Sequence, residues 1–211
     1  MQSPRRNVGI LIFDDVEVLD FCGPFEVFAT TSVPEADRHD LDAKPFNVFT
    51  IAEKADLVKC RGGLLVQPHF TIENHPPLDI LLVPGGWGTR REAQNAALLN
   101  WIALQDKTTE LTTSVCTGAF LLAERGLLDN LSATTHWASL DRLQAGYPSI
   151  NVQRGLRYVD NGRIITSAGV SAGIDMSLHI VARLLGEATA RETAKQMEYE
   201  SSEFLPTDSQ Q

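Results

Sequence analysis

The sequence predicts an α/β fold, in which a mostly parallel sheet is covered by helices on both faces. Apolar segments of strand length alternate with segments of helical spacing along the chain. The strand-length segments, of which residues 8–13 are the first, are continuously apolar, as parallel strands buried on both faces are. Ligands bind such sheets at the carboxyl ends of the strands. The residues that follow each strand are therefore the first candidates for a functional site.

The first half of the chain contains apolar segments that we expect to be strands, at residues 8–13, 46–52, 64–66 and 79–83. A short helix is expected at residues 25–29, because the pair Gly23-Pro24 precedes them and proline suits the start of a helix. The fourth strand stops at Pro84-Gly85-Gly86. Helical spacing then predicts a helix over residues 92–104.

The second half is expected to contain strands at residues 111–115, 133–135, 152–159 and 163–167. Helices are expected directly after Cys116, from His136 to about residue 144, at 172–185 and at 189–199. The segment Asp160-Asn161-Gly162 is a hairpin-turn signal between the last two strands. Residues 201–211 are polar and are expected to fray.

The bulk properties bound the class of protein. A length of 211 residues predicts one domain over residues 1–211, with its core at about 7–200. The net charge of −9 argues against a nucleic-acid partner, because phosphate binding requires a basic face. The apolar run at residues 8–13 is too short to cross a membrane or to form a signal-peptide core. We therefore expect a cytoplasmic protein without a membrane partner.

Three widely spaced cysteines, at positions 22, 60 and 116, form no CxxC motif and no cluster with histidine. We therefore expect no metal site and no disulfide framework. Cys22 and Cys60 are interpreted as structural. Cys116 differs because it lies at the turn between a predicted strand and a predicted helix. The N–H groups and dipole at a helix N-terminus favour thiolate over thiol, which would make Cys116 a nucleophile. The alternative is a small apolar residue that fills the core.

Asp20 is the candidate acid and base. It stands between Leu19 and Phe21 in an apolar stretch, where loss of solvent would raise its pKa. A carboxyl group with a raised pKa can give and accept a proton near pH 7. Spacing alone does not place Asp20 beside Cys116. The acidic residues that precede Asp20 are interpreted as caps or partners of the helix dipole.

Two further segments at strand ends are candidates for the binding pocket. Gly85-Gly86 forms either a simple tight turn or, through its bare backbone, an oxyanion pocket in which the Gly86 and Thr117 N–H groups face Cys116. No phosphate-loop motif is present. His136 follows a short strand, where it is either a base that lines the site or a hydrogen-bonded polar residue.

These residues together resemble the DJ-1/PfpI superfamily, and within it the isocyanide hydratase branch and the amidotransferase-like domains of AraC-type regulators. The matching segments are residues 18–24, 83–86, 114–118, 133–137 and 168–175. The resemblance implies a flavodoxin-like three-layer sandwich, a homodimer, and Cys116 as the nucleophile on a strained elbow. It implies that Asp20 hydrogen-bonds the sulfur, and that Gly85, Gly86 and Thr117 line the anion pocket.

The resemblance also implies a cofactor-independent hydro-lyase that converts a small isocyanide to an N-substituted formamide through a thioimidate on Cys116. The protease-like branch has histidine after the nucleophile; Thr117 stands there and argues against peptidase activity. A regulator would need a helix-turn-helix domain, for which we expect the chain to be too short. The indole of Trp87 is expected to narrow the pocket. The alternatives are a glyoxalase-like activity on methylglyoxal and a sensor in which Cys116 is oxidised.

Overall fold

The computed structural model describes residues 5–33, 43–201 and 204. A sheet of seven strands forms its centre, in the order β10-β11-β7-β6-β1-β2-β5. In chain order these strands are β1 (Arg6–Leu11), β2 (Phe46–Ala52), β5 (Phe70–Thr71), β6 (Ile80–Val83), β7 (Leu111–Val115), β10 (Tyr158–Asp160) and β11 (Ile164–Ser167). All neighbouring pairs in this sheet are parallel except β10 and β11. The predicted mostly parallel sheet is confirmed.

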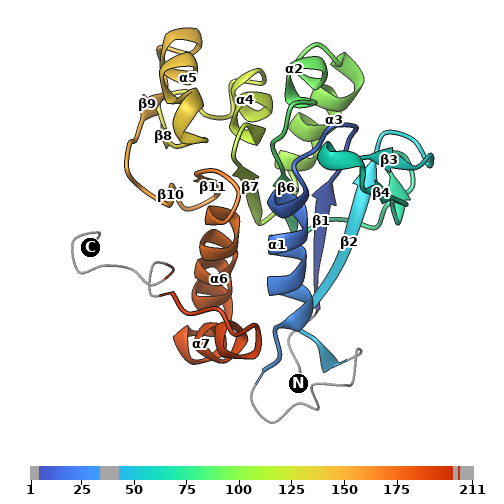
Figure 1. The fold of residues 1–211 in the computed structure, drawn as a ribbon, viewed down its shortest axis with the longest axis vertical. Helices are drawn as coiled ribbons and strands as arrows, with labels where there is room; N and C mark the ends of the chain where they lie inside the picture. Colours follow the sequence, from blue (N-terminus) through green and yellow to red (C-terminus); the bar gives the residue numbers. More distant parts are fainter. Residues whose placement is uncertain (1–4, 34–42, 202–203, 205–211) are drawn as a thin grey trace.

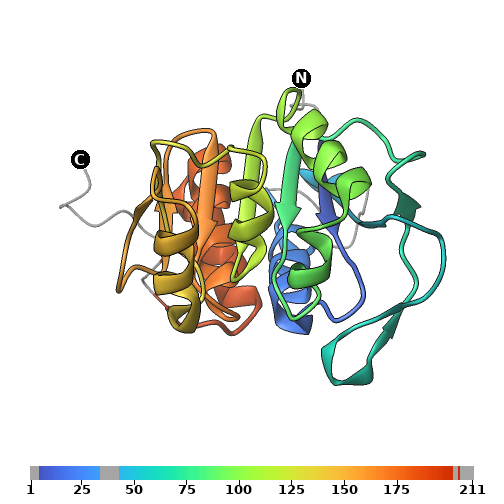
Figure 2. The same ribbon diagram turned by 90° about the horizontal axis from the view of Figure 1, so that it is seen from above.

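Seven α-helices lie in the described part of the chain. They are α1 (Val18–Thr30), α2 (Thr89–Glu92), α3 (Ala96–Asp106), α4 (Gly118–Ala123), α5 (Leu140–Gly146), α6 (Ala172–Leu185) and α7 (Glu187–Gln196). Helix α6 packs against both α1 and α7 (Figure 1). The chain crosses from β1 to β2 in one direction and from β6 to β7 in the other, so right-handed connections place α1 and α3 on opposite faces of the sheet (Figure 2).

The strand sequences explain the three-layer packing. All four side chains of β6 and all five of β7 are buried, as expected for central strands covered on both faces. The core continues through β1 and β2 into the buried faces of α1 and α6. Cys116 and Asp20 both lie at the carboxyl edge of this sheet, after β7 and after β1.

Helix α1 begins at Val18, not at residue 25 as the Gly23-Pro24 pair predicted. Pro24 lies inside the helix and lacks the N–H that would donate to the Asp20 carbonyl. An interior proline costs about 3 kcal/mol. The helix continues because Phe21, Val27 and Phe28 are buried on its inner face, and their burial outweighs that cost. Asp20 therefore stands in the first turn of a helix.

Two predicted elements are divided in the structure. The helix expected over residues 92–104 is split into α2 and α3, because Asn95 is extended and its side chain accepts a hydrogen bond from the Leu98 N–H. The strand expected over residues 152–159 is split into β9 (Asn151–Val152) and β10. β9 pairs with β8 (Ser132–Ala133) in a small separate sheet, and β3 (Val58–Lys59) with β4 (Leu65–Val66) in another.

Two residues of the predicted frayed tail, Ser201 and Phe204, are described, and both make contacts. The Ser201 hydroxyl donates a hydrogen bond of 2.9 Å to Asp175, and Phe204 is buried in the core. The other residues of the segment 202–211 lie outside the described part, so the predicted domain over residues 1–211 stays a prediction. No helix in the described ranges is long and apolar enough to cross a membrane.

Candidate active site

Cys116 occupies a strained elbow between β7 and α4. Its φ angle is +56°, a left-handed conformation that is uncommon for residues other than glycine. The elbow is held from two sides. The Cys116 N–H donates to the carbonyls of Ser167 and Ala168 at 3.2 and 3.1 Å. The Thr135 hydroxyl donates to the Cys116 carbonyl at 2.6 Å. In the sequence, the only signal for Thr135 was its place at a strand end beside His136.

Backbone segments approach the elbow so closely that side chains are excluded. A Cβ on Gly85 would lie 2.5 Å from the Thr117 nitrogen and 2.9 Å from Asp20 Oδ2. A Cβ on Gly118 would lie 2.1 Å from the Val83 carbonyl oxygen. The turn after β6, the start of α4 and the side-chain carboxyl group of Asp20 on α1 therefore meet at one point.

Asp20 is completely buried at this meeting point. Its Oδ2 accepts a hydrogen bond of 2.9 Å from the Gly85 N–H, and its Oδ1 has no hydrogen-bond partner among the described residues. The pKa of Asp20 is raised from 3.8 to about 7, chiefly by burial and also by the charge of Glu17, against the lowering effects of Gly85, Cys116 and the Val170 backbone. The sequence expectation of a desolvated carboxyl group is thus supported.

The electrostatics of Cys116 differ from expectation. The side chain is 6% exposed. Burial and then the charge of Asp20 raise the pKa of Cys116 from 9.0 to about 12. The N–H and hydroxyl of Thr117 lower this pKa, as predicted for the start of a helix, but burial and the nearby carboxylate outweigh them. Cys116 is therefore a thiol, not a thiolate, beside the carboxyl group of Asp20.

The prediction that two backbone N–H groups face Cys116 is wrong for one of them, the N–H of Gly86. The Gly86 N–H is occupied, because it donates to the Thr117 hydroxyl oxygen at 3.0 Å. The Thr89 hydroxyl also approaches that oxygen, at 3.2 Å. The Thr117 N–H has no backbone acceptor in the described part of the chain, and it interacts with the Cys116 thiol, whose pKa it lowers. Thr117 therefore supplies the backbone donor at Cys116, and Gly86 positions the Thr117 side chain.

His136 and Trp87 lie at the margin of the site. The His136 ring lies against Gly169, in the loop that follows β11, and its Nδ1 accepts a hydrogen bond of 3.3 Å from the Ala138 N–H. This bond caps the 3₁₀ turn Trp137–Ser139, which supports the polar structural interpretation of His136. The Trp87 indole is 62% exposed, and the guanidinium groups of Arg61 and Arg90 lie over its ring. That this indole narrows the pocket stays a prediction.

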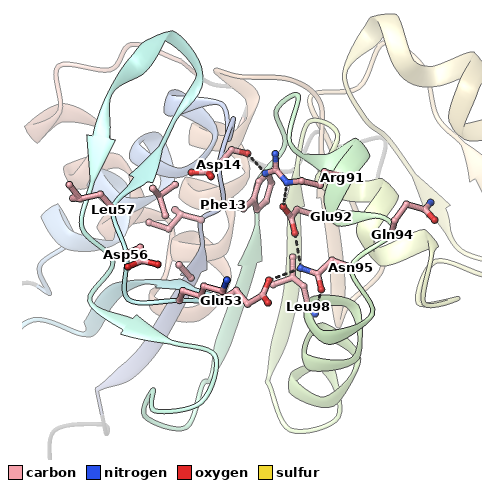
Figure 3. Close-up of a pocket in the computed structure, with 14 residues that line it drawn as sticks. Phe13, Asp14, Glu53, Asp56, Leu57, Arg91, Glu92, Gln94, Asn95 and Leu98 are labelled. Carbon is pink, nitrogen blue, oxygen red and sulfur yellow. Dashed lines mark hydrogen bonds and ion pairs between the residues drawn. The ribbon is translucent and has the colours of Figure 1, made fainter.

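A pocket of about 590 Å³ lies elsewhere, between the ends of β1 and β2 and the α2–α3 segment (Figure 3). Neither Cys116 nor Asp20 lines it. Its polar side chains bind one another: Arg91 donates to Glu92, and Asn95 donates to both Glu92 and Glu53. No group of acidic, histidine or cysteine side chains in the described ranges could hold a metal ion. We interpret the hydrogen bonds among the polar side chains of this pocket as structural.

Fold and site together define an α/β protein with a buried thiol–carboxyl pair on an elbow at the carboxyl edge of a parallel sheet. The chain belongs to the DJ-1/PfpI family, whose model matches residues 6–183. It is 36% identical to isonitrile hydratase of Pseudomonas putida over 195 residues, which are 92% of this chain and 78% of that protein. It is 34% identical to the HTH-type transcriptional regulator CdhR of Pseudomonas aeruginosa, over 66% of this chain and 41% of the regulator.

Solved structures share the fold. A THiJ/PfpI family protein from Pseudomonas syringae matches with a TM-score of 0.82 and 29% identity, covering 97% of this chain and 78% of that one. Drosophila melanogaster DJ-1beta matches with a TM-score of 0.77 at 16% identity, covering 94% of this chain and all of that one. The predicted family and the flavodoxin-like α/β fold are therefore confirmed.

Proposed function

We propose that this protein adds water to a small isocyanide and releases an N-substituted formamide, with Cys116 and Asp20 as the catalytic residues. One observation carries the proposal: a fully buried carboxyl group with a free Oδ1 and a pKa near 7 stands beside a buried thiol. Such a pair can move a proton between sulfur and substrate without a cofactor. The similarity to an isonitrile hydratase supports the substrate class.

In the first step the Cys116 sulfur attacks the terminal isocyanide carbon while its proton passes to ionised Asp20. Asp20 then delivers this proton to the same carbon, which gives the thioimidate Cys116–S–CH=N–R. The raised pKa of Cys116 suits this order, because a thiolate need not exist before the substrate arrives. The carboxyl group is regenerated in its ionised form.

In the second step water adds to the thioimidate carbon. One of the two water protons goes to the substrate nitrogen. The other returns through Asp20 to the sulfur as the C–S bond breaks, which releases R–NH–CHO and the free thiol. The Thr117 N–H, which lies at the Cys116 thiol, is the donor that we assign to the oxygen that water brings to the carbon. Asp20 ends the cycle in the state in which it began.

The raised pKa of Cys116 disfavours the sensor alternative. Oxidation by peroxide proceeds through the thiolate, and burial beside Asp20 reduces the thiolate fraction at neutral pH. The methylglyoxal alternative also uses Cys116 as nucleophile, so it is distinguished by product. Lactate would support it, and formamide supports the hydratase.

The experiment supplies the purified protein with an alkyl isocyanide, an aryl isocyanide and methylglyoxal in separate reactions. We expect formamide from wild type and from Cys22→Ala, whose thiol lies outside the site. We expect none from Cys116→Ala, and at least a hundredfold lower kcat from Asp20→Asn, within the range of general acid–base effects. Intact-mass analysis of Asp20→Asn with substrate should show an adduct on Cys116 if any intermediate accumulates. Formamide production by Cys116→Ala at the wild-type rate would exclude the mechanism.

A further inference from the structure

A second pocket, of about 440 Å³, lies where helices α2, α4 and α5 meet. Both ribbon views show α4 between the other two (Figures 1 and 2). Arg90 comes from α2, Phe120 from α4, Arg142 from α5, and Tyr147 directly follows α5. Neither Cys116 nor Asp20 lines this pocket, and the mechanism above makes no use of it.

The two arginines of this pocket are held by aromatic faces. The Arg142 guanidinium lies 4.1 Å from the centre of the Phe120 ring, and the Arg90 guanidinium lies 5.2 Å from that of Trp87. Stacking uses the face of a guanidinium group and leaves the N–H groups at its edge free. Within the described residues, neither side chain donates a hydrogen bond or forms an ion pair.

Three other arginines are paired with carboxylates. Arg91 binds Glu92, Arg157 binds Asp175 and Arg163 binds Asp106. This pocket instead brings together two guanidinium groups without a carboxylate partner among the described residues, in a chain whose net charge is −9.

The positive charges of Arg90 and Arg142 in this pocket repel each other. The pKa of Arg142 is lowered, first by burial and next by the charge of Arg90. The one carboxylate that lines the pocket, Glu124, is engaged by the Tyr147 hydroxyl. An anion placed between the two guanidinium groups would relieve their repulsion and accept their free N–H groups.

We propose that this pocket binds a small oxoanion, a carboxylate or a phosphate monoester, between Arg90 and Arg142. The planar guanidinium fork matches both anions. The rings of Phe120 and Tyr147, with centres 6.2 Å apart, provide an apolar wall for a short organic body. Thr89 lines the pocket, and its hydroxyl lies 3.2 Å from that of Thr117, so the occupant sits against the wall of the catalytic site. The site does not depend on the proposed hydratase activity.

The test measures binding directly, with propionate and glycerol phosphate as separate probes. Thermal unfolding and isothermal titration are run at constant ionic strength, with sodium chloride replacing each probe. We expect at least one probe to bind wild type saturably and to raise its Tm. Arg90→Gln and Arg142→Gln should each weaken that binding roughly tenfold, the loss typical of a charge-assisted hydrogen bond.

Arg125→Gln is the matched control. Arg125 is exposed, follows α4 and lines neither pocket, so its loss removes the same charge without removing a pocket donor. It should bind as wild type does. Binding of propionate alone identifies a carboxylate site, and binding of glycerol phosphate alone a phosphate site. Failure of both probes to bind wild type, or equal weakening by Arg125→Gln, would overturn the proposal.

Discussion

Asp20 is the residue whose environment sets the chemistry of the site. With a pKa of about 7, it loses its proton near neutral pH, while Cys116 stays protonated. The reactive form in our mechanism is the thiol beside the ionised carboxylate. We therefore predict that kcat/KM for isocyanide rises with pH through about 7. A profile that is flat between pH 5 and 9, measured with excess buffer at constant ionic strength, contradicts this role.

The same raised pKa predicts how stability depends on pH. Between about pH 4 and pH 7 the folded chain keeps a proton on Asp20 that the unfolded chain has released, so the free energy of unfolding contributed by this group falls as pH rises. Asp20→Asn removes this effect. We expect the variant to be more stable than wild type at pH 8, by up to about 4 kcal/mol, and the difference to shrink towards pH 4. Urea unfolding at both pH values measures it.

Thr135 holds the nucleophile by its backbone. Replacement by valine keeps the shape but leaves the buried Cys116 carbonyl without the Thr135 donor. We predict a loss of about 1–3 kcal/mol in unfolding free energy and a lower kcat, because the strained elbow loses one of its two supports. Thr135→Ser, which retains the hydroxyl, is the control and should keep most of both. Equal behaviour of the two variants would show that the hydrogen bond does not matter.

The candidate catalytic residues could be found from the sequence, but the direction of the pKa shift could be predicted only for Asp20, not for Cys116. The apolar neighbours of Asp20 were enough to predict its desolvation. The same burial acts on Cys116, yet the position of Cys116 at a helix start predicted the opposite shift. Only the structure shows the Asp20 charge next to the sulfur, because no spacing rule connects residues 96 positions apart.

At the scale of elements, the site depends on a close approach between the turn after β6 and the start of α4. Gly85→Ala would place a methyl group 2.5 Å from the Thr117 nitrogen, and backbone cannot move aside cheaply there. We predict a lower Tm and loss of measurable turnover. Gly146→Ala is the matched control: its Cβ meets no atom within 4 Å, and alanine favours the end of α5. The prediction fails if both variants keep wild-type activity.

Element boundaries were predicted well where burial alone decides them. Strand β2 has the expected bounds, and so does α6. The errors occur where a local signal competes with packing. Pro24 suggested a helix start, but the burial of Phe21 places it inside α1. Asn95, which divides α2 from α3, was passed over because the apolar spacing runs across it.

At the scale of the whole molecule, topology brings the site together. The loops after β1, β6 and β7 all leave the carboxyl edge of three adjacent strands, so Asp20, Gly85 and Cys116 meet although they are far apart in sequence. The alternation of strands and helices predicted this convergence. Strands were expected at residues 64–66, 133–135 and 152–159, but their apolar pattern did not predict that β4, β8 and β9 pair in two small sheets outside the main one.

The exposed apolar surface leads to the last prediction, on assembly. Trp137 is 79% exposed, more than any other large apolar side chain in the described part of the chain, and it follows His136 at the margin of the site. A surface indole of this kind is typical of an interface. We predict a homodimer, with a mass in solution of twice the 23.2 kDa of one chain, and Trp137 in its interface.

Light scattering coupled to size-exclusion chromatography measures that mass. Trp137→Glu should shift the equilibrium towards the single chain by placing a charge in a dry interface, while its cost to the folded chain stays small because the position is exposed. Leu104, which lies on α3, is also apolar and exposed, and Leu104→Glu should leave the dimer intact. A single-chain mass for wild type at micromolar concentration contradicts the homodimer. A dimer that survives Trp137→Glu unchanged excludes Trp137 from the interface, and the contact between copies must then use a different face of the sheet and its helices.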